Sequence, residues 1–311
     1  MRPFLPHERT GHPGVLRWLL RRVVCGQYPR RDLGWQALLR HRLAETTKDA
    51  DMFVRPDDFR AFLELLGETR YEGTLPAYRA AVSAPLAEPW ASAGWIAHFE
   101  FPVTHGPRPR IYVLARPPRI ARDALPREGV APLFLLAETK KTRREAKDWG
   151  QVSTLGHFLL DAGDARGLLL LQDAEELLER LSILQPDAEL LAQRPALRLA
   201  VARSDQLGPA LETERRFWRC FDAERLAIYD RARRPYTHAV QACATVLPRD
   251  LLRQHETLCR LAEAHLLGDP LGAPGIDGLI AEARRRALLG YPSEFGTFLP
   301  AESVVAQPWK T

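Results

Sequence analysis

Glu138 and Lys140 are the residues whose types and spacing most plainly suggest chemistry. The segment 131–141 reads APLFLLAETKK, and its apolar part predicts a buried strand that ends at Ala137. Side chains alternate between faces along a strand, so Glu138 and Lys140 are expected on the same side. A carboxylate beside an ammonium group suits phosphodiester hydrolysis. The carboxylate would hold a magnesium ion, and the lysine would orient the attacking water or stabilise charge in the transition state.

A metal site of this kind needs a second acid, and two residues are candidates. Asp123 lies in RIARDALP, fifteen positions before Glu138, in a sequence typical of a loop. Glu100 lies in the first strand of a predicted hairpin, which covers residues 94–118 and contains no aspartate. The sequence leaves the choice between Asp123 and Glu100 open.

Lys141, Arg143 and Arg144 continue the motif in the basic run KKTRREAK, residues 140–147. These side chains are expected to contact a phosphate backbone beside the metal. The run is equally typical of the solvated first turn of a helix, where Glu145 offsets part of the charge. Both interpretations fit the sequence.

The surrounding pattern predicts an α+β fold whose sheet would position these residues. Aromatic and β-branched residues predict the hairpin strands, and continuous apolar runs predict two further strands and a possible fifth. A helix before the hairpin and two helices after the motif complete an αβββαβ core with a mixed sheet. The ranges are a helix at 74–84, strands within 94–103, 110–118, 131–141 and 166–173, helices at 144–163 and 174–184, and the possible strand at 195–203.

Two helical regions are expected to flank this core. Residues 1–86 read as wholly helical, with apolar spacing at 14–24 and 32–45 and a capped helix at 55–68. Residues 87–204 form the predicted core. Residues 205–311 contain three amphipathic helices followed by a tail, 291–311, that is typical of a loop. The three helices are predicted at 211–233, 248–268 and 276–290.

These features resemble the PD-(D/E)xK nuclease superfamily. The tripeptide ETK after PLFLLA, followed by a helix and the segment RGLLLLQD, is similar to the core of that superfamily. The resemblance implies a restriction-endonuclease-like fold that uses Mg²⁺ or Mn²⁺. It implies that Glu138 binds the metal and Lys140 is catalytic, with Asp123 or Glu100 completing the site. Gln151 is placed like a glutamine that some branches carry in the following helix, and is expected to contact nucleic acid.

The composition is consistent with a nucleic-acid partner. The chain has 311 residues, a formal net charge of +5 and a pI of about 9.2, with most of the basic charge on arginine. Arginine suits phosphate because its planar fork donates two hydrogen bonds at once. A GC-rich source genome would favour arginine equally well, so the charge alone does not decide.

The sequence also indicates where the protein is located and which enzyme classes it does not resemble. Four separated cysteines and no long apolar segment predict a cytoplasmic protein without a membrane partner. No Walker loop, GxGxxG, HExxH or GxSxG motif occurs, which argues against several common enzyme classes.

Two functions follow as hypotheses. The first is a metal-dependent nuclease, or nuclease subunit, that hydrolyses DNA in defence, mobile elements or repair, as the resemblance implies. The alternative is a non-catalytic nucleic-acid-binding or assembly protein that keeps the nuclease fold, and the missing hairpin aspartate favours it. A protein partner or a homo-oligomer is compatible with either hypothesis.

Overall fold

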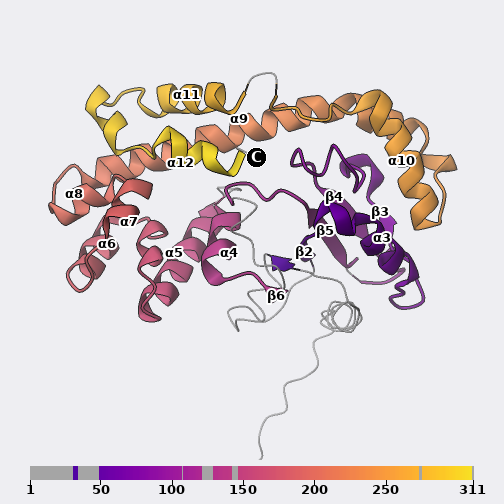
Figure 1. The fold of residues 1–311 in the computed structure, drawn as a ribbon, viewed down its shortest axis with the longest axis horizontal. Helices are drawn as coiled ribbons and strands as arrows, with labels where there is room; N and C mark the ends of the chain where they lie inside the picture. Colours follow the sequence, from indigo (N-terminus) through magenta and orange to yellow (C-terminus); the bar gives the residue numbers. More distant parts are fainter. Residues whose placement is uncertain are drawn as a thin grey trace, which may run out of the picture.

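The predicted α+β class is confirmed by the computed structural model, which describes residues 31–33, 49–106, 108–120, 129–141, 146–272 and 275–309. A mixed sheet occupies one half of the molecule, and most of the helices gather in the other half (Figure 1).

The sheet of the described residues has six strands in the order β3-β4-β5-β2-β1-β6. The predicted hairpin is confirmed, since β4 pairs with β5 in antiparallel fashion and Phe99 lies opposite Ile111. The parallel pairs β2–β5 and β1–β6 make the sheet mixed. The strands are β1 (Arg31–Leu33), β2 (Asp49–Phe53), β3 (Ala77–Tyr78), β4 (Ala97–Glu100), β5 (Arg110–Leu114) and β6 (Gly129–Val130).

The α-helices follow the amphipathic patterns well in the C-terminal region. The structure confirms the three predicted C-terminal helices and the helices predicted at 55–68, 144–163 and 174–184. Gly163, with a positive φ of 81°, ends the helix predicted at 144–163. The α-helices are α3 (Phe59–Glu68), α4 (Leu133–Lys140), α5 (Ala146–Asp161), α6 (Ala174–Leu181), α7 (Ala188–Gln193), α8 (Leu197–Val201), α9 (Leu207–Ala242), α10 (Leu251–His265), α11 (Gly275–Ala287) and α12 (Glu302–Ala306). The 3-10 helices are η1 (Pro56–Asp58), η2 (Ala80–Val82), η4 (Ala165–Leu169), η5 (Ala244–Val246), η6 (Ser293–Phe298) and η7 (Gln307–Trp309).

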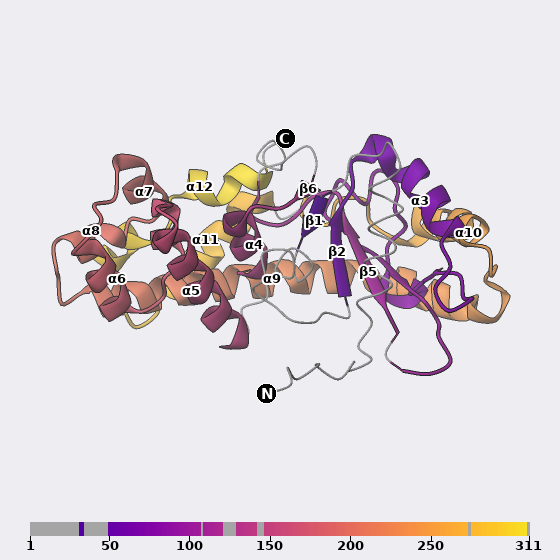
Figure 2. The ribbon, with the colours of Figure 1, turned by 90° about the horizontal axis from the view of Figure 1, so that it is seen from below.

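Helix α9 joins the two halves of the molecule. It runs along the whole length, from the end that holds α6, α7 and α8 to the side of the sheet (Figures 1 and 2). Near its start, Leu207 and Leu211 pack with the leucines of η4 and α6. Further along, Phe217, Phe221 and Tyr236 pack in the core that also contains the buried sheet residues. The helix therefore fixes the sheet relative to the helical half.

Three predicted strands are wrong, because the chain forms helices there. Residues 133–140 form α4, residues 165–169 form η4, and residues 197–201 form α8. The apolar runs in all three are rich in leucine and alanine, which favour helices, and nearly free of the β-branched residues that favour strands. A short apolar run does not by itself distinguish a strand from a buried helix.

The N-terminal region is not wholly helical, which corrects the prediction for residues 1–86. It contributes β1, β2 and β3 to the sheet, and the helix predicted at 74–84 is replaced by β3 and η2. The helix predicted at 14–24 and most of the one at 32–45 lie outside the described residues. The tail predicted as a loop contains η6, α12 and η7.

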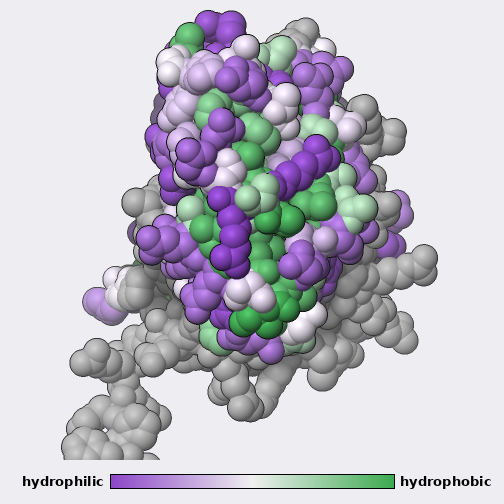
Figure 3. Space-filling model, turned by 90° about the vertical axis from the view of Figure 1, so that its left-hand side faces the viewer, coloured by the Kyte–Doolittle hydropathy of each residue, from purple (hydrophilic) through white to green (hydrophobic). Residues whose placement is uncertain are grey.

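The end of the molecule where α6, α7 and α8 lie exposes a band of hydrophobic residues between hydrophilic ones (Figure 3). Large side chains exposed on or beside these helices include Ile183 and Val201. Such a band is typical of an interaction surface. It fits the predicted protein partner or homo-oligomer, which stays a prediction. Among the described residues, none of the helices has both the length and the apolar character that crossing a membrane requires.

Replacing Tyr236 with phenylalanine is expected to preserve or raise stability at neutral pH. The Tyr236 side chain is fully buried in α9, and its hydroxyl has no hydrogen-bond partner among the described residues. Removing an unsatisfied buried hydroxyl relieves a desolvation cost of about 1–3 kcal/mol. Urea unfolding of both proteins measures the difference, and a loss of more than about 1 kcal/mol in the variant would show that the hydroxyl is satisfied.

The same substitution is expected to reduce the loss of stability in alkaline solution. Burial raises the pKa of Tyr236 well above its usual value, with a smaller contribution from Cys259. The unfolded tyrosine ionises near pH 10 while the folded one stays protonated, so this contribution to stability is present below about pH 10 and is lost above it. Between neutral pH and about pH 11, the wild type should lose roughly 1 kcal/mol more than the Tyr236→Phe variant. Equal losses would contradict the assignment.

Candidate anion-binding site

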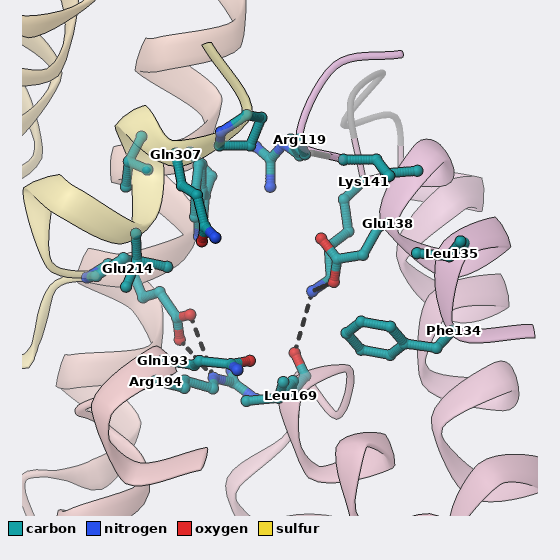
Figure 4. Close-up of a pocket in the computed structure, with 16 residues that line it drawn as sticks. Arg119, Phe134, Leu135, Glu138, Lys141, Leu169, Gln193, Arg194, Glu214 and Gln307 are labelled. Atoms are coloured by element: carbon teal, nitrogen blue, oxygen red, sulfur yellow. Dashed lines mark hydrogen bonds and ion pairs between the residues drawn. The ribbon is translucent and has the colours of Figure 1, made fainter. Parts of the chain in front are cut away.

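A pocket of about 300 Å³ lies between several helices and the loop after β5, and separate elements build its wall (Figure 4). The loop after β5, α4, η4, the end of α7, α9 and the α12–η7 segment all contribute. Glu138 and Lys141 come from one side, while Glu214 and Arg194 face them from the other. The charged and aromatic residues in the wall are Arg119, Phe134, Glu138, Lys141, Arg194, Glu214 and Trp218.

Arg194 follows α7 and forms a buried ion pair with Glu214 of α9. Its Nε donates to both carboxylate oxygens of Glu214, at 3.2 and 2.9 Å, and only 4% and 10% of the two side chains are exposed. Its Nη1 donates to the carbonyl oxygens of Leu168 and Leu171, at 2.9 and 2.6 Å, at the end of η4. Its Nη2 is buried and has no partner among the described residues. The contacts with Glu214 and with the two carbonyl oxygens therefore hold this guanidinium in the wall of the pocket.

Lys141 and Glu138 form a second ion pair on the opposite wall. They lie three residues apart at the end of α4, so they share a helix face. Lys141 Nζ lies 2.5 Å from Glu138 Oε1 and 3.2 Å from the carbonyl oxygen of Leu169. Burial lowers the pKa of Lys141, and the neighbouring Glu138 carboxylate acts in the opposite direction. An ammonium group has three donors, so one remains beyond these two contacts.

Arg119 supplies the third cation, from the loop that follows β5. Its φ of 68° lies in the left-handed region, which costs a non-glycine residue energy and is concentrated at functional sites. Its Nη2 donates to Asp222 Oδ2 at 2.7 Å, and its guanidinium lies 3.7 Å from the centre of the Trp218 ring. Its Nε is buried without a partner among the described residues. Asp222 and Trp218 therefore hold this guanidinium in place.

The charges behind Arg119 are also buried. Asp222 lies 3.6 Å from Arg225 Nε as well as beside Arg119. Burial raises the pKa of Asp222, and the two arginines oppose that rise. Burial likewise lowers the pKa of Arg119, which Asp222 and then Glu138 oppose. An anion that entered the pocket would lie beside cations that have already lost their water.

The arrangement is suited to binding an anion. Arg119, Lys141 and Arg194 line one small pocket, and the Lys141 ammonium has a third donor beyond its two described contacts. Arginine and lysine side chains only donate, so a ligand of these groups has to offer acceptor atoms. Phosphate and carboxylate groups provide acceptor oxygens, and charged hydrogen bonds to them are the strong ones.

Glu138 and Lys140 do not lie on the same side, because they belong to a helix and not to the predicted strand. Successive residues of an α-helix are turned by about 100°, so residues two apart project in nearly opposite directions. Glu138 lines the pocket, whereas Lys140 is buried outside its wall. The helix instead brings Lys141 beside Glu138. The motif therefore supplies a pocket cation, but it is the lysine one position later.

Glu100 is not brought to Glu138. It lies in β4, and the β6 strand that precedes α4 is four strand spacings away, roughly 19 Å across the sheet. Its carboxylate pairs with Arg79 at 3.4 Å and with Arg108 at 3.1 Å.

The other predicted site residues are placed only in part. Asp123, Arg143 and Arg144 lie outside the described residues. Gln151 lies in α5, as predicted for a helix, but is not part of the pocket wall. Its Oε1 is buried without a partner among the residues that the structure describes.

Asp123, a predicted metal ligand, lies outside the described residues, so the magnesium site stays a prediction. No group of three or more histidine, cysteine, aspartate or glutamate side chains among them is arranged to hold a metal. The two carboxylates of the pocket, Glu138 and Glu214, each hold a cationic side chain where a metal would bind. The donor set therefore fits an anion better than a divalent cation.

Several pocket residues were not predicted from the sequence. Arg119, Arg194, Glu214 and Trp218 come from the predicted core and from the C-terminal region, so no local spacing connects them. Arg194 alone carried a weak signal, as a single arginine between two apolar stretches. No protein-family model, curated protein or solved structure matches the chain, so its function has to be inferred from its own residues.

Proposed function

We propose that the protein binds nucleic acid without cleaving it, and that the central pocket holds one of the phosphate groups. The observation that carries the proposal is the convergence of Arg119, Lys141 and Arg194 on one pocket. Phosphate offers several charged acceptor oxygens, and charged hydrogen bonds from lysine and arginine to such oxygens are the strong ones.

The overall charge supports a nucleic-acid partner. The net charge of +5 attracts polyanions over longer distances than any single pocket does. Arginines on the exposed face of α9, among them Arg219 and Arg234, add positive charge to the helix that also carries Glu214 and Trp218. Contacts of this type position a strand through its backbone and do not read its sequence.

The second candidate function is the metal-dependent nuclease that the resemblance implies, with a restriction-endonuclease-like core. The observation that favours it is that Glu138 lines the pocket. A magnesium ion would have to replace the Lys141 ammonium beside Glu138, and Asp123 would have to supply a second carboxylate. Lys140 would have to take part from the other face of α4, which the position of its side chain does not support.

Binding is tested by fluorescence anisotropy with labelled single-stranded DNA, duplex DNA and RNA. Lys141→Met is expected to weaken binding about tenfold, because a charged hydrogen bond is lost. Lys140→Met is the matched control, since it removes the neighbouring buried lysine outside the pocket wall and should change affinity less than about twofold. Failure of the wild type to bind any of the three probes would contradict the proposal.

Cleavage is tested with the same proteins after addition of magnesium or manganese. We expect no cleavage by the wild type. Cleavage that disappears in Glu138→Ala and Lys140→Ala would instead establish the nuclease. Glu138→Gln separates the two functions further. It removes a negative charge from the pocket while its amide oxygen can still accept from Lys141, so phosphate binding should tighten, whereas a nuclease would lose its metal ligand.

A further inference from the structure

The cations of the pocket are recessed rather than projecting. Only 6% of the Arg119 side chain and 11% of the Lys141 side chain are exposed, and Arg194 is buried still further. A phosphate within a strand is esterified on both sides, so its two sugars would have to enter with it. The pocket of about 300 Å³ lies at the lower limit for small-molecule sites, which favours a small terminal group over a continuous strand. A phosphate attached through one ester can enter end-on.

The number of cations also distinguishes the two kinds of phosphate. Lys141, Arg194 and Arg119 come from different walls of the pocket. A phosphomonoester has three terminal oxygens and a charge of about −1.5 to −2 at neutral pH. A phosphodiester within a strand has two such oxygens and a single charge. Three cations on separate walls therefore match the monoester, which has the larger charge and the larger number of terminal oxygens.

From these observations we infer that the pocket binds a terminal phosphomonoester, on the end of a nucleic-acid strand or on a free mononucleotide. The identification of the ligand as a nucleic-acid strand rests on the proposed function. The identification of its bound group as a phosphomonoester rests on the recessed cations alone. Glu138 and Glu214 hold Lys141 and Arg194 in position, and Asp222 does the same for Arg119. The site is thus formed before the ligand arrives, which lowers the cost of ordering it on binding.

The test compares oligonucleotides of one sequence that carry a 5′-phosphate, a 3′-phosphate or hydroxyl groups at both ends, each with the same internal label. One phosphorylated strand is expected to bind at least about tenfold more tightly than the hydroxyl strand. Lys141→Met should reduce that difference to about twofold or less, while Lys140→Met should preserve it. Free dAMP, measured by titration calorimetry, tests the mononucleotide as the source.

Each outcome has a separate meaning. Equal affinity for all three strands would overturn the inference and leave the proposed nucleic-acid binding intact. Binding of dAMP without binding of any strand would support the phosphomonoester site and overturn the proposed function. A preference for the phosphorylated strand that survives Lys141→Met would overturn the assignment to this pocket. Failure to bind any strand or dAMP would overturn both proposals.

Discussion

Arg194→Met is expected to lower the free energy of unfolding by about 3–5 kcal/mol, because it leaves a buried carboxylate without its partner. Glu214 is 10% exposed, and both of its oxygens accept from Arg194 Nε. The substitution also removes the donor that Leu168 and Leu171 share. The loss is measured by urea unfolding at neutral pH.

A second substitution distinguishes the buried charge from a simple packing defect. Replacing both members of the pair, as in Arg194→Met with Glu214→Leu, removes the unpaired charge and is expected to recover at least half of the loss. Recovery should stay incomplete because the two leucine carbonyls still lack their donor. A loss below about 1 kcal/mol in the single variant would show that the pair behaves like an exposed ion pair.

Gly167→Ala is expected to lower the free energy of unfolding by about 3 kcal/mol through overpacking. A β-carbon at residue 167 would lie 2.6 Å from Leu160 Cγ and would also press on the backbone oxygen of Gly156. Backbone cannot move aside as a flexible side chain can, so η4 would have to shift away from α5. That shift would displace the Leu169 carbonyl that accepts from Lys141.

Gly150→Ala is the control for the glycine experiment. Gly150 lies in the same helix as Gly156, and an added β-carbon would meet nothing within 4 Å. Alanine favours a helix over glycine, so this variant should gain up to about 1 kcal/mol in urea unfolding. If Gly150→Ala and Gly167→Ala lowered the free energy of unfolding by similar amounts, the close approach of α5 and η4 would not be the cause of the loss in Gly167→Ala.

The sequence predicted the fold well where residue types and periodicity agree. The β4–β5 hairpin is rich in isoleucine, valine and aromatic residues, and it forms as predicted. Helices α9, α10 and α11 also follow their apolar spacing. The segments that became α4 and η4 are leucine-rich and buried on several sides, so they carry no periodicity that separates a strand from a helix.

The site was predicted only through one of its segments. The polar end of the segment 131–141 does reach a pocket, and Glu138 lines it. The wrong secondary structure selected Lys140, because a strand pairs residues two apart whereas a helix pairs residues three or four apart. Arg119 and Arg194 come from loops distant in sequence, and only the packing of α9 brings them together.

The most direct test of phosphate binding at this pocket is the salt dependence of strand binding by Lys141→Met and Lys140→Met. Each phosphate contact on a single strand contributes about 0.7 to the slope of log affinity against log salt concentration. We predict that Lys141→Met reduces the slope by about this amount and that Lys140→Met leaves it at the wild-type value. Equal slopes for all three proteins would contradict the account, because Lys141 would then contact no phosphate.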